Sequence, residues 1–310
     1  MKLLMDMDIG DDIDDAIALY AAMCRGSEIV GVTTVFRNTR ERACQARKLM
    51  MEFGGGYENV PVYMGYGNPM GKDPKPEAHI CHYTPELDED RYVPQNTDPE
   101  DAVDFIIDAC YRYGKELTVI AIGPFTNIGR VIEKDPNALN QVGKVAIMGG
   151  AFYKQYVDWN VCCDVTAADV MFSNLKNLEC IGADVTHFMI GEDRLYDNLL
   201  NYEGNDKGHL YLTELCRLWR VDRPTAKLLL HDPLVVYYVE DPSLCEMKTA
   251  HVTVLTEGYA VGLTVNADAC GKRRYFPKEY EDFDEQKTVL VAAKGDRDTF
   301  NERIFRDFDR

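Results

Sequence analysis

Short apolar runs alternate along the chain with segments whose apolar residues recur every three or four positions. Runs of strand length occur at 2–5, 28–35, 60–64, 117–122, 144–148 and 179–182. Helical spacing predicts helices at 14–24, 39–53, 101–113, 126–133 and 166–174, then two or three more between 193 and 239. The tail is expected to be mostly β over 247–293, with a last helix near 298–308. This alternation predicts an α/β fold with a single open, mostly parallel sheet flanked by helices.

Nothing in the sequence divides the chain. It has no internal repeat, no Gly/Ser linker and no change of composition, so we expect one domain over residues 1–310. Residues 65–96 are rich in Gly, Pro, His and Tyr, which predicts a long loop of a kind that is often functional. Ligand sites of parallel sheets lie at the carboxyl ends of the strands, so the residues directly after each apolar run are the candidates for function.

The chain carries a strong acidic excess. Its 34 Lys and Arg against 52 Asp and Glu give a formal charge of −18. Nucleic acids and anionic membranes need a positive surface, so neither is an expected partner. No window approaches the roughly 18 consecutive apolar residues of a membrane helix, and the N-terminus reaches Asp6 too early for a signal peptide. Ten scattered cysteines without a Cys-x-x-Cys pair indicate reduced thiols and predict a cytoplasmic protein.

The segment after the first apolar run concentrates the acidic residues. Residues 6–15 read Asp-Met-Asp-Ile-Gly-Asp-Asp-Ile-Asp-Asp, which places six carboxylates in ten residues. Like charges this close repel unless something positive lies among them, and hard divalent cations take oxygen ligands of this kind. A solvated acidic loop is the alternative, but the cluster directly follows a predicted buried strand. We therefore expect a cation site here.

Two known acidic patterns fit this segment poorly. A calcium EF-hand loop needs glycine at its sixth position and glutamate at its twelfth. Counted from Asp6, those positions hold Asp11 and Ile17, which excludes it. A haloacid-dehalogenase-type phosphatase also opens with a strand and Asp-x-Asp, but usually has Thr or Val where this chain has Gly10. A metal-dependent phosphatase with Asp6 as nucleophile therefore stays only as a minor alternative.

A third pattern fits better. The chain resembles the inosine-uridine preferring nucleoside hydrolase family, which opens with Asp-x-Asp-x-Gly and then Asp-Asp-Ala. Here Asp14-Asp15-Ala16 supply the second part after two extra residues, Asp11 and Asp12. Further matches follow in the family's order: Asn38, Gly-Pro-Phe-Thr-Asn-Ile at 123–128, Gly149-Gly150, Asp-Trp-Asn at 158–160 with Asp164, Gly-Ala-Asp-Val-Thr-His at 182–187 and His-Asp-Pro at 231–233. Each motif alone is weak, but their common order from residue 2 to about residue 265 is specific.

The resemblance implies a Rossmann-like nucleoside hydrolase fold and a calcium-dependent enzyme that hydrolyses the N-glycosidic bond of purine or pyrimidine ribonucleosides. It implies that Asp8 is the general base and a calcium ligand, and that His231 lies beside the nucleobase and can protonate it. The other calcium ligands would be the carboxylates of Asp15 and Asp232 and the main-chain carbonyl of Ile122. Substrate contacts would come from Asp14, Asn38, His82, Asp158, Trp159, Asn160 and Trp219. Similar proteins are usually homodimers or homotetramers and act in nucleoside salvage.

Several of these residues have a structural alternative. Asn38 and Asn160 could cap helices, Trp219 could belong to the core, and His231 could be a core histidine. His79 shares with His82 the expectation of a site role. By the same resemblance, Asp6 is expected to support Asp8 from behind, and His187 is expected to be structural.

Two departures from the family concern the sugar. Asp158 replaces a glutamate and is one methylene shorter. The stretch 151–157 is also short and lacks an asparagine that commonly binds the 5′-hydroxyl. The pentose could therefore be held differently. A non-catalytic ribosyl-binding protein on the same fold is the main rival from another functional class, although Asp8, Asp15 and Asp232 are all present.

Overall fold

The computed structural model describes residues 1–72, 80–269 and 288–309. The strands are β1 (Lys2–Met7), β2 (Glu28–Thr34), β3 (Val62–Met64), β4 (Leu117–Ala121), β5 (Lys144–Met148), β6 (Leu178–Ile181), β7 (Cys245–Val254), β8 (Thr264–Asn266) and β9 (Thr288–Gly295). The helices are α1 (Asp14–Cys24), α2 (Thr39–Phe53), α3 (Glu100–Tyr113), α4 (Thr126–Lys134), α5 (Ala138–Gln141), α6 (Trp159–Cys163), α7 (Val165–Asn174), α8 (Ala183–Thr186), α9 (Asp193–Asn201), α10 (Lys207–Asp222), α11 (His231–Glu240) and α12 (Arg297–Phe308). Short 3-10 turns lie at Tyr57–Asn59, Pro85–Asp88, Gly114–Glu116 and Pro242–Leu244.

The strands of the described chain form one nine-stranded sheet in the order β3-β2-β1-β4-β5-β6-β9-β7-β8. The pairs from β3 to β9 in this order are parallel, while β7 pairs antiparallel with both β9 and β8. The predicted open, mostly parallel sheet is therefore confirmed. The antiparallel part is the C-terminal edge, where the sequence shows strands without intervening helices.

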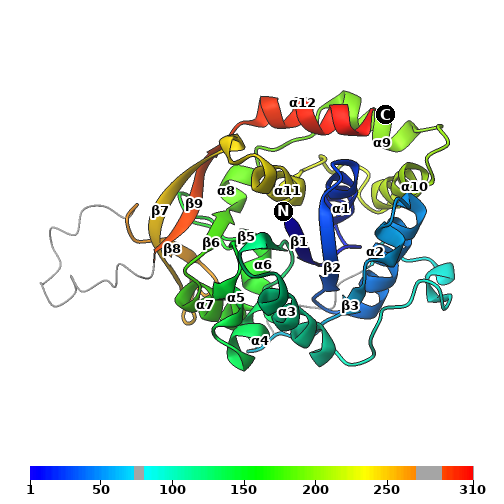
Figure 1. Cartoon of the computed structure of the whole chain (residues 1–310). Helices are drawn as coiled ribbons and strands as arrows, with labels where there is room; N and C mark the ends of the chain where they lie inside the picture. The colour runs from blue at the N-terminus through cyan, green and yellow to red at the C-terminus, as the bar shows by residue number, and fades with distance from the viewer. Residues whose placement is uncertain (73–79, 270–287, 310) are drawn as a thin grey trace, which may run out of the picture.

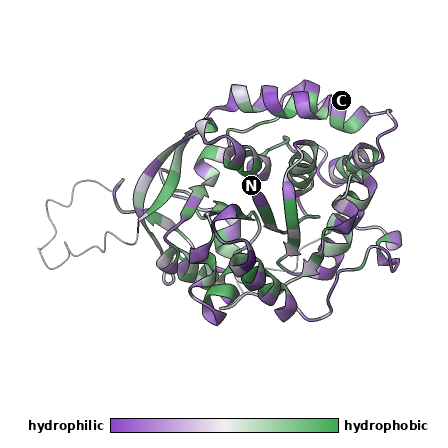
Figure 2. Cartoon of the chain, in the orientation of Figure 1, coloured by the Kyte–Doolittle hydropathy of each residue, from purple (hydrophilic) through white to green (hydrophobic). Residues whose placement is uncertain are grey.

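Helices cover both faces of the sheet (Figure 1). One core cluster joins the sheet to α1, α2, α10, α11 and α12, and the other joins it to α3, α4, α5 and α7. The strands are mostly apolar in Figure 2, while the outer faces of the helices are polar, as burial of the sheet on both sides requires. No helix in the described ranges is both long and apolar enough to cross a membrane.

The order of the strands reverses between β1 and β4. The chain runs outward from β1 to β2 and β3, and then returns to place β4 on the other side of β1. Parallel sheets leave a crevice at such a point, outside the carboxyl ends of the two strands. The residues that follow β1 and β4 are Asp8 and Ile122, so the fold itself puts two predicted site residues at one crevice.

Candidate active site

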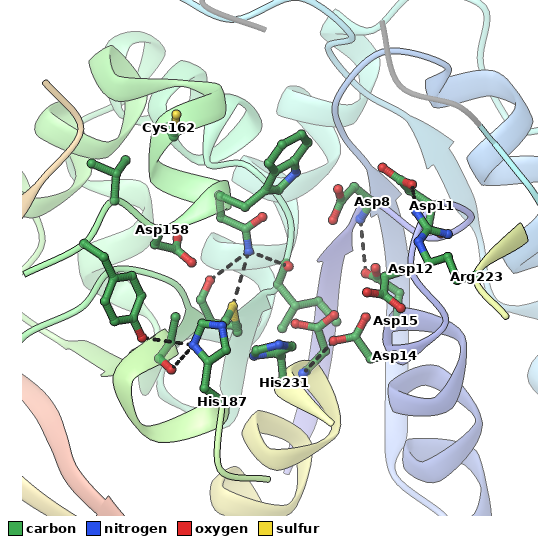
Figure 3. Close-up of a pocket in the computed structure, with 18 residues that line it drawn as sticks. Asp8, Asp11, Asp12, Asp14, Asp15, Asp158, Cys162, His187, Arg223 and His231 are labelled. Carbon is green, nitrogen blue, oxygen red and sulfur yellow. Dashed lines mark hydrogen bonds and ion pairs between the residues drawn. The ribbon is translucent and has the colours of Figure 1, made fainter. Parts of the chain in front are cut away.

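A cavity of about 580 Å³ lies at this crevice. Its walls come from the turn after β1, the first turn of α1, the ends of β4 and β5, the segment from Tyr156 to Cys162, and the starts of α8 and α11 (Figure 3). Nine of the predicted site residues line this cavity: Asp8, Asp14, Asp15, Ile122, Asp158, Trp159, Asn160, His231 and Asp232. The structure thus brings together residues that lie more than 200 positions apart in the sequence.

Three buried carboxylates form the floor of the cavity. Asp14 and Asp15 are the first residues of α1, and Asp232 is the second residue of α11. One oxygen of each lies within 4.8 Å of the others, and the backbone N–H of Asp232 donates to Asp14 Oδ2 at 3.4 Å. The N-termini of both helices thus face the cluster, and their dipoles offset part of its negative charge.

The three carboxyl groups are poorly stabilised as anions by the protein alone. Burial raises the pKa of Asp14, Asp15 and Asp232 well above the usual range, and repulsion from neighbouring carboxylates raises it further. An all-oxygen set of this kind fits a hard divalent cation, which would remove both effects at once. The residues present therefore fit a metal site.

Asp8 stands beside this cluster at the end of β1. Its backbone N–H donates to Asp15 Oδ1 at 3.2 Å, and its side chain lines the cavity. Burial raises its pKa to about 6, with the charge of Arg42 opposing that rise and the charge of Asp11 adding to it. A carboxylate with such a pKa is a suitable acceptor for a proton near neutral pH.

Asp6 is directed away from the cavity. It is fully buried and accepts hydrogen bonds from Thr33 Oγ1 at 2.6 Å and Asn127 Nδ2 at 2.7 Å. Burial raises its pKa to about 7. Because its carboxyl group does not line the cavity, its position does not support the phosphatase alternative, in which Asp6 would attack the substrate.

The segment Asp158-Trp159-Asn160 forms the start of the short helix α6. Asp158 caps this helix, accepting the N–H of Val161 at 3.1 Å, and burial raises its pKa. Asn160 Nδ2 donates to the carbonyls of Ile122 at 2.9 Å and Met148 at 3.1 Å, which fixes the carbonyl predicted as a ligand. Trp159 is 47% exposed at the cavity, which leaves its indole accessible to a flat ligand.

His231 lies on the opposite wall. Its Nδ1 is 2.6 Å from Thr186 Oγ1, and its ring meets that of His187 edge-on with centroids 5.1 Å apart. Burial, with a smaller contribution from His187, lowers the pKa of His231 to about 4. The ring is therefore uncharged at neutral pH and offers a neutral N–H donor or a lone pair.

His187, expected to be structural, also lines the cavity. Its Nδ1 is 2.7 Å from the carbonyl of Ala183 and 3.0 Å from the hydroxyl of Tyr156. Arg223 lines the cavity as well, and sequence reasoning did not consider it. Its Nη2 pairs with Asp11 Oδ1 at 2.6 Å (Figure 3). His187 ends the Gly-Ala-Asp-Val-Thr-His motif at 182–187, which was the sequence signal for it, whereas no local signal marks Arg223.

Other predicted site residues do not line the cavity. Trp219 is 1% exposed and belongs to the core on α10, and His82 is fully buried, with its carbonyl accepting from Gln45 Nε2 at 3.3 Å. Asn38 precedes α2 at the N-cap position, but its side chain makes no capping hydrogen bond. His79 lies outside the described residues.

Comparisons with known proteins agree with this geometry. A family model described as inosine-uridine preferring nucleoside hydrolase matches residues 3–302. The chain is 30% identical to uridine nucleosidase 1 of Arabidopsis thaliana over 278 residues, covering 85% of this chain and 81% of that protein. It is 25% identical to the inosine-uridine preferring nucleoside hydrolase of Crithidia fasciculata over 277 residues, covering 85% and 87% of the two chains. Among solved structures, a plant nucleoside hydrolase superposes with a TM-score of 0.81 at 25% identity, covering 99% of this chain and 98% of that one.

Proposed function

The chain belongs to the inosine-uridine preferring nucleoside hydrolase family, and from this premise we propose that it hydrolyses the N-glycosidic bond of ribonucleosides, releasing the free base and ribose, with calcium as cofactor and Asp8 as general base. The observation that carries the proposal is the position of Asp8. It lies at the switch point of the sheet, hydrogen-bonded through its N–H to one of three converging carboxylates.

The proposed metal ligands are Asp8, Asp15, Asp232 and the carbonyl of Ile122. A bound calcium ion would supply positive charge that lowers the pKa of a water molecule and orients it. Asp8 would accept a proton from the attacking water, because its side chain lines the cavity beside the other proposed metal ligands. Buried carboxylates around the sugar would stabilise the positive charge that develops on it as the bond to the base breaks.

The remaining residues are assigned to the two ends of the substrate. Asp14, Asn160 and Asp158, which line the cavity, would bind the sugar hydroxyls. Asn38 does not line the cavity, and the family resemblance alone assigns it to the sugar. At the base, Trp159 would offer an aromatic face, and His231 would donate a hydrogen bond or proton to the leaving group. His82 and Trp219 are buried and do not line the cavity, so we assign them at most an indirect contribution to base binding.

The decisive experiment is sugar release from a panel of purine and pyrimidine ribonucleosides, with and without calcium, after chelation. We expect calcium-dependent release, and a loss of at least ~10²-fold in kcat for Asp8→Asn, which keeps the size of the side chain but cannot accept the proton. Asp12→Asn alters a more exposed carboxyl of the same turn and should cost less. A greater loss for Asp12→Asn would move the general base to that residue, and nucleoside binding without sugar release would favour the ribosyl-binding alternative.

We also propose that residues 1–310 form one catalytic domain that works in the cytoplasm as a homodimer or homotetramer. Similar proteins are usually homodimers or homotetramers, which supports the proposed oligomer. The scattered cysteines, with no Cys-x-x-Cys pair, support the proposed cytoplasmic location. Light scattering gives the number of subunits, and a monomer would contradict this part of the proposal.

A further inference from the structure

Arg42 is a buried cation to which the proposed mechanism assigns no role. It lies near the start of α2, and its side chain has no exposed surface. Its Nε donates to the carbonyl of Phe36 at 2.8 Å, and its Nη1 donates to the carbonyl of Ile9 at 2.9 Å and to that of Asp8. A guanidinium is always charged, and its burial is costly unless its surroundings compensate. The question is therefore why the protein buries this charge among these three carbonyls.

The three acceptor carbonyls belong to two separate turns. One is the acidic turn after β1, and the other follows β2. In the second turn, Phe36 and Arg37 have φ values of 69° and 58°, a left-handed conformation that is unfavourable for residues other than glycine. Such a conformation persists only where the surrounding structure enforces it. The hydrogen bond from Arg42 to the Phe36 carbonyl is one of the contacts that enforce it.

The acidic turn lines the cavity, and the turn after β2 packs against its wall. Asp8 lines it directly, and the ring of Phe36 lies edge-on to that of Trp159, which also lines it, with centroids 6.2 Å apart. Gly123, just after β4, packs closely between the turns: a Cβ there would lie 2.7 Å from Val35 Cγ1 and 2.9 Å from Asp8 Oδ1. A shift of either turn would therefore move the Asp8 carboxylate relative to the aromatic wall.

We propose that Arg42 is a positioning residue for the hydrolysis, which fastens the acidic turn to the turn after β2 and so fixes the Asp8 carboxylate relative to the sugar. This inference rests on the proposed function. It requires the planar fork of the guanidinium, because three carbonyls from two turns are held by donors in one plane. A lysine would keep the charge but lose the fork.

Arg42 is hydrogen-bonded to the turn of Asp8 and not to the carboxylate cluster, on which it acts only through its charge, which a lysine would keep. Its hydrogen bonds within the described chain go to main-chain carbonyls of residues 8, 9 and 36. Asp14, Asp15 and Asp232 are held instead at the first turns of α1 and α11. Of the four proposed calcium ligands, only Asp8 belongs to the turn that Arg42 holds. Loss of the fork should therefore lower kcat more than it weakens calcium binding, whereas general loosening of the fold would affect both.

The test is Arg42→Lys in the full chain, measured by kcat on a nucleoside that the wild type hydrolyses and by calorimetric titration with calcium. We expect kcat to fall about 10- to 100-fold, the effect of a small misplacement of a catalytic group, while the calcium dissociation constant changes less. Arg47→Lys is the matched control. Arg47 lies on the same helix and donates to the carbonyl of Arg91 at 3.1 Å, away from the cavity, so its replacement should leave kcat unchanged.

Three results would overturn the inference. The first is a wild-type kcat for folded Arg42→Lys, which would mean that only the charge of Arg42 matters. The second is a loss of calcium affinity in Arg42→Lys as large, in fold-change, as the loss of kcat. An inactive wild type would instead overturn the proposed function and this inference with it. If Arg42→Lys does not fold, Arg37→Gly is added, because glycine accepts a φ of 58° without strain. The third result is that the Arg42→Lys/Arg37→Gly double variant has wild-type kcat or also fails to fold. Either outcome would mean that Arg42 contributes to folding and not to the position of Asp8.

Discussion

Burial changes the acid–base character of the two side chains closest to the proposed chemistry. It raises the pKa of Asp8 to about 6 and lowers that of His231 to about 4. Near neutral pH the carboxylate can accept a proton, and the imidazole is uncharged. His231 is therefore not a charged imidazolium that could give a proton readily. As a neutral ring, it can assist the leaving group mainly through a hydrogen bond.

The role of His231 is tested by changing the leaving group. His231→Ala should lower kcat/KM most for natural nucleosides, whose bases leave poorly without a proton or hydrogen bond, by about 10²-fold for loss of such a group. Nitrophenyl riboside, whose leaving group needs no proton, should be hydrolysed nearly as fast as by the wild type. Steady-state kinetics on both substrates decide the point. Equal losses would mean that His231 only positions the sugar or supports the fold.

At the scale of elements, the short helix α6 gives Asp158 two tasks. Its carboxylate accepts the N–H of Val161 as a helix cap and also lines the cavity. The family's glutamate is longer by one methylene, so the shorter side chain here lies close to its own backbone, in the geometry of a cap. Capping and sugar binding therefore compete for the same carboxylate.

The two tasks of Asp158 can be separated by substitution. Asp158→Asn keeps an oxygen that can cap α6, so thermal stability should change little, whereas Asp158→Ala should cost about 1 kcal/mol of unfolding free energy. If the carboxylate also binds the sugar, both variants should raise KM for ribonucleosides. Denaturant unfolding and kinetics, measured on the same preparations, test this. A KM unchanged in Asp158→Asn would leave Asp158 as a helix cap alone.

The sequence predicted the long elements well because each spans several periods of its pattern. The helices at 14–24 and 39–53 have the observed bounds, and the strand at 144–148 also agrees. The short helices α5, α6 and α8 were not predicted, since four or five residues show no periodicity. Where strands follow one another without helices, as in β7 to β9, the pattern predicted β structure but not its antiparallel pairing.

The candidate site was predictable only in part, for a related reason. Motif order and the strand-end rule identified the acidic turn and the His-Asp-Pro segment, which the structure brings to one cavity. Arg223 and Arg42 were not predicted, because their hydrogen-bond partners are distant in the sequence. Arg223, for example, donates to Asp11, 212 positions away. No local pattern reports a tertiary contact of that kind. Conversely, Trp219 has the spacing of a base-binding aromatic but is buried in the core.

At the scale of the whole molecule, the buried carboxylates around the cavity repel one another when ionised, which destabilises the metal-free fold, and a bound cation would offset this repulsion. Burial raises the pKa of Asp6 to about 7 and that of Asp8 to about 6, and it raises those of Asp14, Asp15 and Asp232 well above their usual range. In the metal-free protein the folded state therefore binds more protons than the unfolded state from about pH 4 to at least pH 7. The free energy of unfolding should fall as pH rises through this window, because the carboxyl groups are forced to ionise close together.

Calcium should reverse this pH dependence. Protons compete with calcium for the same carboxylates, so added calcium should raise the melting temperature little at pH 5 and strongly at pH 8. At a hundredfold excess over Kd, a ligand that binds only the folded state stabilises it by about 2.7 kcal/mol. With an unfolding entropy of about 2.1 cal/mol/K per residue, this corresponds to a rise of roughly 4 °C for a chain of 310 residues. Thermal unfolding after chelation, with calcium restored at each pH, measures both effects, and Asp15→Ala should blunt the response to calcium. A shift that is the same at pH 5 and pH 8, or one that survives in Asp15→Ala, would place the calcium site elsewhere.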